Sequence, residues 1–230
     1  MEEEEAIKRG IDLEKLKKEQ KKLAKSIQIK DSIDFSLAER IAGISGVFSG
    51  NMMFCGIIVM NPSLEIIEQQ YHSEKVNFPY IPGFRAYREL PVMIKTLEKL
   101  EVKPDLILVP AHGILHSRLG LASHLSIATG IPTIGVAKSL IEGEQKDNEI
   151  FLNGKKVGEV VRLKEKSSPI YISPGNMISL KTAVELTKKL STYHKLPEPL
   201  YQAHRYADKI MKEIIQPKKT GEKIDAQETI

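Results

Sequence analysis

The feature that most constrains the fold is a change in the apolar pattern near residue 84. Before that point, turn-forming stretches at 49–51 and 61–63 separate three β-rich runs, which predicts an antiparallel meander. After it, helical spacing alternates with short apolar runs, which predicts parallel strands joined by right-handed crossovers. We therefore expect an α/β protein whose mixed sheet is antiparallel at its start, parallel afterwards, and flanked by helices. The expected strands are 41–48, 54–60, 65–71, 106–109, 133–136 and 170–173, with a hairpin over 150–163 that turns at Asn153 and Gly154; the expected helices are 84–100, 118–129 and 179–190, the last capped by Ser179.

The two ends of the chain differ from its middle. Residues 1–30 are highly charged but keep one apolar face, which predicts an amphipathic helix packed on the core. Residues 216–230 are polar without apolar periodicity, which predicts a flexible tail. Residues 31–215 are then expected to form a single domain. The apolar face of the N-terminal helix comprises Leu13, Leu16, Leu23 and Ile27.

The composition excludes several classes of protein. The single cysteine, Cys55, excludes an internal disulfide and a CxxC zinc or redox site; its apolar flanks predict an inert core thiol in a reducing cytoplasm. No window approaches 18 uninterrupted apolar residues and the chain opens on acidic residues, so we expect neither a membrane span nor a secretion signal. The net charge of +4 permits a polyanionic partner without requiring one.

Four segments place Pro, Gly, Tyr and charged residues at expected strand ends and loops, where binding residues are common. The segments are 41–45 (IAGIS), 79–89 (PYIPGFRAYRE), 109–118 (VPAHGILHSR) and 132–138 (PTIGVAK). With the later 172–175 (ISPG) and 196–199 (LPEP), they resemble the endonuclease V family over nearly the whole chain.

This resemblance implies a ribonuclease-H-like fold, which agrees with the mixed sheet predicted from the apolar pattern. It also implies Mg²⁺-dependent cleavage of the second phosphodiester on the 3′ side of a deaminated purine, hypoxanthine in DNA or inosine in RNA. The implied partner is DNA or RNA, and we expect a cytoplasmic monomer that does not bind membranes.

The resemblance also identifies where this chain departs from the family. The family's acidic metal ligands fall at the positions of Ser45, Glu89 and Pro110, and of these only Glu89 is acidic. Because Mg²⁺ needs several hard oxygen ligands and gives up its water reluctantly, metal binding and cleavage are expected to be weak or lost. Asp105 precedes the strand whose end carries Pro110, so we expect it at the opposite end of that strand and not as a replacement ligand.

Other positions match the family's functional residues. Taken singly they would be ordinary surface or packing residues, and the resemblance favours functional roles. Tyr80 is expected to act as a wedge beside the flipped base, while Ala111 stands where the family has glycine and is expected to narrow the base pocket. The implied catalytic residues are Glu89, His116, Lys138 and His204; the implied nucleic-acid-binding residues are Pro79, Tyr80, Pro82, Gly83, Arg118 and Gly120.

The sequence leaves three functions open. Ser45 and Pro110 favour a protein that recognises deaminated purine with weak or lost cleavage. The alternative is an active Mg²⁺-dependent endonuclease V that cuts 3′ to inosine in DNA repair. A scaffold for protein contacts is the third possibility, and the retention of Tyr80, His116 and Lys138 argues against it.

Overall fold

The computed structural model describes residue 6 and residues 8–164 and 167–215. The predicted tail, 216–230, lies outside the described residues, as do residues 1–5 and 7 of the predicted N-terminal helix. In the part described, a mixed sheet of nine strands runs in the order β3-β2-β1-β4-β5-β9-β8-β7-β6. The strands are β1 (Ile41–Ser49), β2 (Met52–Met60), β3 (Ile66–Lys75), β4 (Leu106–Val109), β5 (Thr133–Ala137), β6 (Glu144–Lys146), β7 (Glu149–Leu152), β8 (Lys155–Val161) and β9 (Ile170–Asn176).

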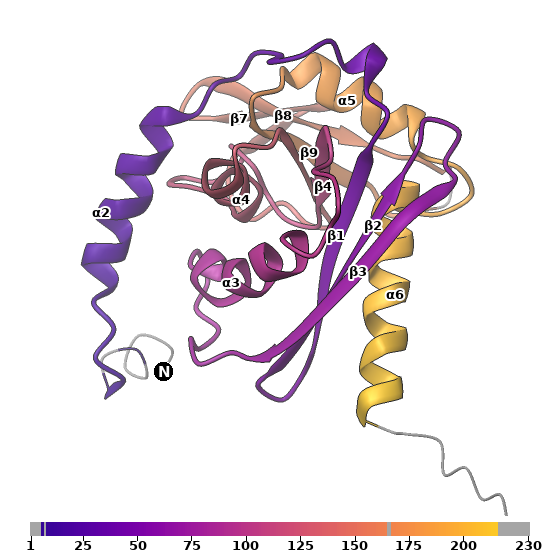
Figure 1. Cartoon of the computed structure of the whole chain (residues 1–230). Helices are drawn as coiled ribbons and strands as arrows, with labels where there is room; N and C mark the ends of the chain where they lie inside the picture. Colours follow the sequence, from indigo (N-terminus) through magenta and orange to yellow (C-terminus); the bar gives the residue numbers. More distant parts are fainter. Residues whose placement is uncertain (1–5, 7, 165–166, 216–230) are drawn as a thin grey trace, which may run out of the picture.

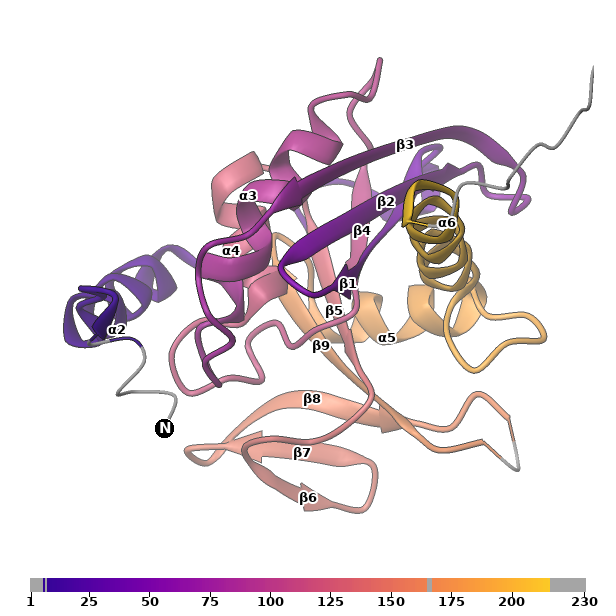
Figure 2. The same ribbon diagram turned by 90° about the horizontal axis from the view of Figure 1, so that it is seen from below.

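The predicted fold class is confirmed, and the parallel part of the sheet is smaller than the apolar pattern indicates. β1, β2 and β3 form the antiparallel meander, and β1, β4 and β5 are parallel. The chain then leaves β5 through the hairpin strands β6, β7 and β8, and β9 returns antiparallel to β5. Two parallel neighbouring strands need a crossover connection, usually a helix, and no helix lies between β5 and β9. β9 therefore pairs with β5 in the antiparallel direction. Figure 2 shows β6, β7 and β8 extending away from the helices that flank the meander.

Helices cover both faces of the sheet: α3 (Arg85–Leu97), α4 (Leu121–Thr129), α5 (Leu180–Lys189) and α6 (Glu198–Ile215). A further helix, α2 (Leu13–Leu23), does not pack on the strands. In Figure 1, α3 and α4 lie on one side of the strands, and α5 and α6 lie on the other. The predicted cap of α5 is confirmed, because the Ser179 hydroxyl accepts a hydrogen bond from the main-chain N–H of Thr182.

The longest helix, α6, was not predicted from the sequence. Pro197 and Pro199 suggest a turn, but proline is tolerated in the first turn of a helix, where its missing N–H has no helical acceptor. The buried positions that follow recur at helical spacing. They are Leu200, Ala203, Ala207 and Ile210. α6 packs closely on β1, where a Cβ atom added to Gly43 would lie 2.1 Å from the Pro199 carbonyl oxygen.

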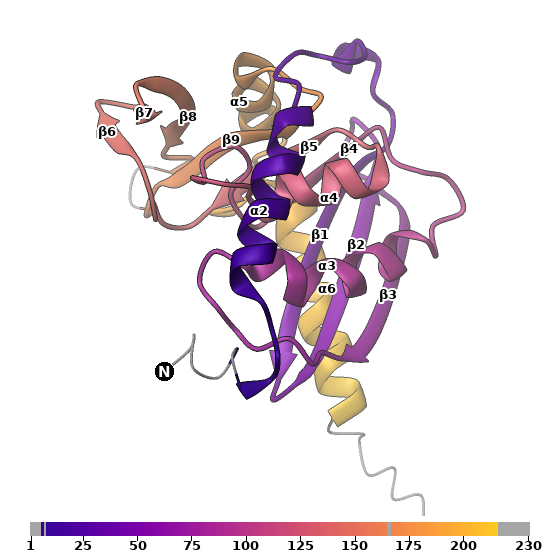
Figure 3. The ribbon, with the colours of Figure 1, turned by 90° about the vertical axis from the view of Figure 1, so that its left-hand side faces the viewer.

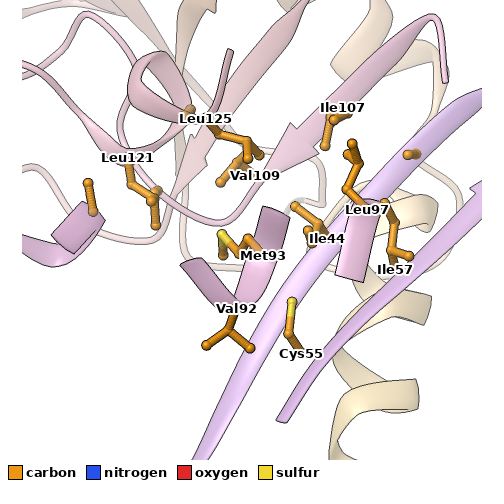
Figure 4. Close-up of a cluster of buried hydrophobic side chains, with 14 of the residues drawn as sticks. Ile44, Cys55, Ile57, Val92, Met93, Leu97, Ile107, Val109, Leu121 and Leu125 are labelled. Atoms are coloured by element: carbon orange, nitrogen blue, oxygen red, sulfur yellow. The ribbon is translucent and has the colours of Figure 1, made fainter. Parts of the chain in front are cut away.

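The core beneath α3 and α4 is apolar and almost fully buried. Ile44, Ile57 and Met93 have no exposed surface, and Figure 4 shows them packed with residues of β1, β2, β4 and both helices. Cys55 lies in this cluster, and burial raises the pKa of its thiol to about 12. The thiol is therefore protonated at neutral pH, as expected for an inert core cysteine.

The N-terminal helix lies beside α3 and α4. Leu13 and Leu16 of α2 pack against Ile81 and Phe84, which flank the Pro82–Gly83 turn. Figure 3 shows α2 running along this side of the molecule. Within the described residues, no helix has the length and apolar content of a bilayer-spanning segment.

The three parallel strands determine where a site can form. Gly43 pairs with Leu108, and Val109 pairs with Gly135, so the register brings Ser45, Pro110 and the end of β5 to the same edge of the sheet. Ligands of α/β sheets bind at this edge, beyond the carboxyl ends of parallel strands.

Candidate nucleic-acid interface

A cavity of about 490 Å³ opens at this edge of the sheet. It brings together residues that are far apart in the sequence, including most of those predicted to be functional. Its wall includes Ser45, Tyr80, Pro82, Gly83, Arg85, Pro110, Ala111, His112, His116, Arg118, Gly120, Lys138, Glu142 and His204. Glu89 is ion-paired with Arg85, and Pro79 is buried at the start of the loop that carries Tyr80.

The loop from 79 to 84 presents an aromatic ring to solvent. The Phe84 N–H donates to the Ile81 carbonyl at 3.0 Å, and Gly83 has φ +79°, so Pro82 and Gly83 form the centre of a tight turn. Ile81 is 3% exposed and anchors the turn, whereas Tyr80 is 57% exposed. The loop therefore presents an exposed aromatic ring on a backbone fixed by the turn, which reduces the conformational entropy that binding would remove.

Gln20 ties this turn to α2 and to the loop before α4. Its amide donates to the Gly83 carbonyl at 2.9 Å, and its Oε1 accepts from Arg118 Nε at 2.8 Å. Arg118 Nη2 also donates to the Gly83 carbonyl, and the guanidinium lies 4.9 Å from the centre of the Phe84 ring. The left-handed φ of Gly83 favours glycine here, and a Cβ atom would also lie 2.3 Å from Arg118 Nη2 and displace the end of that side chain.

Arg85 occupies the part of the cavity beside Glu89. Its Nε and Nη2 donate to the two carboxylate oxygens of Glu89 at 2.7 and 2.8 Å, and its Nη1 donates to the Pro110 carbonyl at 3.4 Å. The Glu89 side chain is only 6% exposed, against 38% for Arg85. Burial opposes the charge of Arg85, but the hydrogen bonds and charge of Glu89 outweigh burial and hold the pKa of Arg85 above its usual value.

This arrangement does not fit a Mg²⁺ ion. Both Glu89 oxygens bind a guanidinium, Ser45 offers a neutral hydroxyl, and Pro110 offers a carbonyl that Arg85 already contacts. Mg²⁺ needs anionic oxygens at about 2.0–2.1 Å, and the adjacent guanidinium would repel it. Among the described residues, no group of three or more His, Cys, Asp or Glu side chains is arranged to hold a metal ion.

Three histidines of the cavity are biased toward the neutral form. Burial lowers the pKa of His112, His116 and His204, and a nearby cation lowers it further in each case: Arg85, Arg118 and Lys138, respectively. His112 Nε2 donates to the Ser139 carbonyl at 2.9 Å, and His116 Nδ1 accepts from the Arg118 N–H at 3.1 Å. His204 Nδ1 lies 3.4 Å from the Ser45 hydroxyl, so α6 brings its histidine directly to β1.

Backbone packing explains one predicted binding residue. A Cβ atom on Gly120 would lie 2.2 Å from the His112 carbonyl oxygen and 2.3 Å from that of Gly113. Glycine at 120 is therefore needed to seat the start of α4 against the loop after β4. Ala111, by contrast, is 3% exposed and its side chain belongs to the core cluster under α3 and α4.

The structure brings the predicted positions together but adds residues that the sequence did not single out. Ser45, Pro110, His116, Lys138 and His204 line one cavity, and Arg85 links Pro110 to Glu89. Arg85, Gln20 and His112 were not identified as site residues from the sequence. The spacing of Arg85 and Glu89 was an available signal, because residues four apart on a helix are neighbours. Asp105 accepts hydrogen bonds from the N–H groups of Glu39 and Arg40, at the opposite end of β4 as expected.

The order of the strands and the helices on both faces define a ribonuclease-H-like α/β protein. A family model described as endonuclease V matches residues 21–205. Endonuclease V of Thermosipho melanesiensis is 37% identical over 182 residues, covering 75% of this chain and 80% of the relative. That of Dictyoglomus thermophilum is 38% identical over 185 residues, covering 76% of each. The chain belongs to the endonuclease V family.

Solved structures agree with this assignment. The catalytic domain of human endonuclease V superposes with a TM-score of 0.81 at 27% identity, covering 88% of this chain and 97% of the human one. Ciona intestinalis endonuclease V, solved with a 24mer DNA that contains an inosine followed by a ribo-adenosine, gives a TM-score of 0.79 at 25% identity. It covers 88% of this chain and 98% of the other.

Proposed function

We propose that this chain binds DNA or RNA containing a deaminated purine, hypoxanthine or inosine, and that it has little or no phosphodiester cleavage activity. It acts as a monomer on a single strand segment that enters the cavity. The observation that carries this proposal is the pairing of Arg85 with both oxygens of Glu89. Glu89 is the one acidic residue at the family's metal positions, and both of its oxygens accept hydrogen bonds from Arg85 instead of facing an open metal site.

The loss of a metal would remove two contributions to cleavage. A bound metal activates the attacking water and stabilises the charge that develops on the leaving oxygen. The side chains of Ser45 and Pro110 supply neither an anion nor a strong base in its place. Cleavage would then lack both its nucleophile and its main electrostatic stabilisation.

The features that support binding do not depend on a metal. Tyr80 is exposed on a fixed turn at the mouth of the cavity, and base–aromatic stacking is tolerant of sequence. The wall carries three cationic side chains, Arg85, Arg118 and Lys138. Among the described residues lining the cavity, Glu142 is the only carboxylate. The excess of positive charge favours a phosphate backbone.

The relatives support the choice of ligand. The Ciona protein is described in complex with DNA that contains inosine, and it shares the fold of this chain over most of its length. We assign the same class of ligand to the cavity on this basis.

The test scores binding and cleavage separately. Labelled single- and double-stranded DNA and RNA, each with or without one inosine, are incubated with the protein in Mg²⁺, Mn²⁺ or EDTA. We expect preferential binding of the inosine strands in all three conditions and no nicking above background. Robust nicking at inosine, abolished by chelator and by Glu89→Ala, would show instead that the chain is an active Mg²⁺-dependent endonuclease. Equal binding of inosine and control strands would contradict the recognition of deaminated purine.

A further inference from the structure

We propose that the Arg85 guanidinium is a built-in cation that binds a backbone phosphate of the nucleic acid, at the place where the family resemblance puts a metal ion. The inference rests on the proposed function, because it requires a nucleic-acid strand in the cavity.

The orientation of Arg85 is set by two elements. Glu89, one turn further along α3, holds Nε and Nη2, while the Pro110 carbonyl after β4 lies 3.4 Å from Nη1. Contacts from a helix and from a strand end restrict the plane of the guanidinium more than a surface ion pair would. An exposed pair at this helical spacing would have both side chains in water, whereas the Glu89 side chain is 6% exposed.

Arg85 retains donors for a ligand. A guanidinium has five N–H groups, and Glu89 and Pro110 accept three of them. Within the described residues, the remaining two N–H groups, one on Nη1 and one on Nη2, have no protein acceptor. The side chain is 38% exposed and forms part of the cavity wall, so these donors are accessible to a strand in the cavity. These two N–H groups can donate charge-assisted hydrogen bonds to the oxygens of one phosphate.

The surroundings favour an anion. Lys138 and Arg118 line the same cavity as Arg85, so three cationic side chains face the space that a strand would occupy. A phosphate that binds the two remaining N–H groups would lie away from the Glu89 carboxylate, which is held by Nε and the other Nη2 hydrogen, so Glu89 would offset the attraction only in part. The site thus provides charge-assisted hydrogen bonds without an exchangeable ion.

The test compares Arg85 variants for binding to a labelled single-stranded DNA that contains one inosine, in EDTA and at several salt concentrations. Arg85→Gln is expected to weaken binding about tenfold and to reduce the slope of log affinity against log salt by about one unit, because one phosphate contact is lost. Arg85→Lys keeps the charge and is expected to keep the slope while losing part of the affinity. Lys188→Gln, an exposed α5 position outside the cavity, is the matched control and is expected to bind like wild type.

The outcomes separate this inference from the proposed function. If wild type prefers the inosine strand and Arg85→Gln binds it with unchanged affinity and slope, the phosphate role of Arg85 is wrong while the proposed function stands. If wild type shows no preferential binding, both are wrong. Circular dichroism and the thermal midpoint of each variant check folding, and Arg85→Lys decides the question if Arg85→Gln does not fold: an unchanged affinity for the lysine variant contradicts a bidentate contact.

Discussion

Tyr80 provides the most direct residue-scale test of binding. Its ring is 57% exposed beside the cavity, and the buried Ile81 holds the turn that carries it. Tyr80→Ala is expected to weaken binding to an inosine oligonucleotide by about 1–3 kcal/mol, the range for loss of one stacked base. Fluorescence anisotropy measures the change, and Tyr80→Phe, which keeps the ring, serves as the control. Equal affinities for wild type and Tyr80→Ala would exclude stacking by this residue.

Restoration of cleavage requires more than the missing acids. The sequence alone points to Ser45→Asp with Pro110→Asp as the smallest restoring change. The structure adds Arg85, because its guanidinium would continue to bind both Glu89 oxygens. We expect the double variant to remain inactive and the triple variant, with Arg85→Leu, to gain Mg²⁺-dependent nicking at inosine.

A strand-nicking assay with inosine DNA measures this gain. Adding Glu89→Ala to the triple variant is expected to abolish it, since three anionic ligands become two. Cleavage by the double variant equal to that of the triple would mean that Arg85 leaves Glu89 free to bind a metal. Ala111 is the remaining departure from the family near this position, and its buried side chain leaves little freedom to adjust.

The site residues that could be predicted from the sequence are those whose residue type alone indicates a change in the site. Ser45 and Pro110 were identified because a neutral residue stands where the family has an acid, and the structure places both in one cavity. Gln20 could not be found in this way. Its partner Arg118 is 98 positions away, and the amide is informative only once α2 is placed beside the Gly83 turn.

At the scale of elements, α2 supports the recognition loop through Gln20. The amide is fully buried and donates to the carbonyls of Gly83 and Leu119. Gln20→Leu removes the donor to the Leu119 carbonyl and the acceptor of the Arg118 Nε–H, so we expect a loss of about 1–3 kcal/mol in the free energy of unfolding. Urea denaturation measures the loss. Lys22→Leu, an exposed change on the same helix, is expected to have little effect, and equal stabilities of the two variants would argue against this role of Gln20.

Some helices and strands could be predicted from the sequence and others could not. β4 and β5 are short continuous apolar runs, and a fully buried parallel strand leaves that pattern in any sequence. α6 begins between Pro197 and Pro199. Two prolines so close together suggest a turn, so the helical spacing of the apolar residues that follow was not recognised. The direction of β9 was also not predictable, because it depends on the path of the chain through β6, β7 and β8 and not on the residues of β9.

At the scale of the whole molecule, buried histidines make stability depend on pH. Burial lowers the pKa of His124 below its ordinary value of 6.5, and among the described residues its Nδ1 has no hydrogen-bond partner. The unfolded chain therefore binds more protons than the folded chain as the pH falls below about 6.5, so the free energy of unfolding decreases with acidification. The histidines of the cavity add to the same trend.

Chemical denaturation between pH 5 and pH 7.5 tests this dependence. His124→Phe keeps an aromatic ring against Tyr87, whose centre lies 5.5 Å from the histidine ring. We expect the variant to lose less stability than wild type on acidification, because one group that must gain a proton has been removed. Parallel stability curves for the two proteins would show that His124 does not contribute.

The order of the strands has a consequence for the behaviour of the protein at high concentration. The two outer strands, β3 and β6, are the places where a second chain could extend the sheet. β6 has only three residues, all exposed and two of them charged, which gives an incoming strand little to pair with. β3 is longer and exposes Ile66 and Ile67, but Lys99 sets its ammonium group against this strand by donating to the Tyr71 carbonyl at 2.8 Å. This contact occupies one main-chain acceptor on the open edge of β3 and places a positive charge there, and both features disfavour pairing with a second chain.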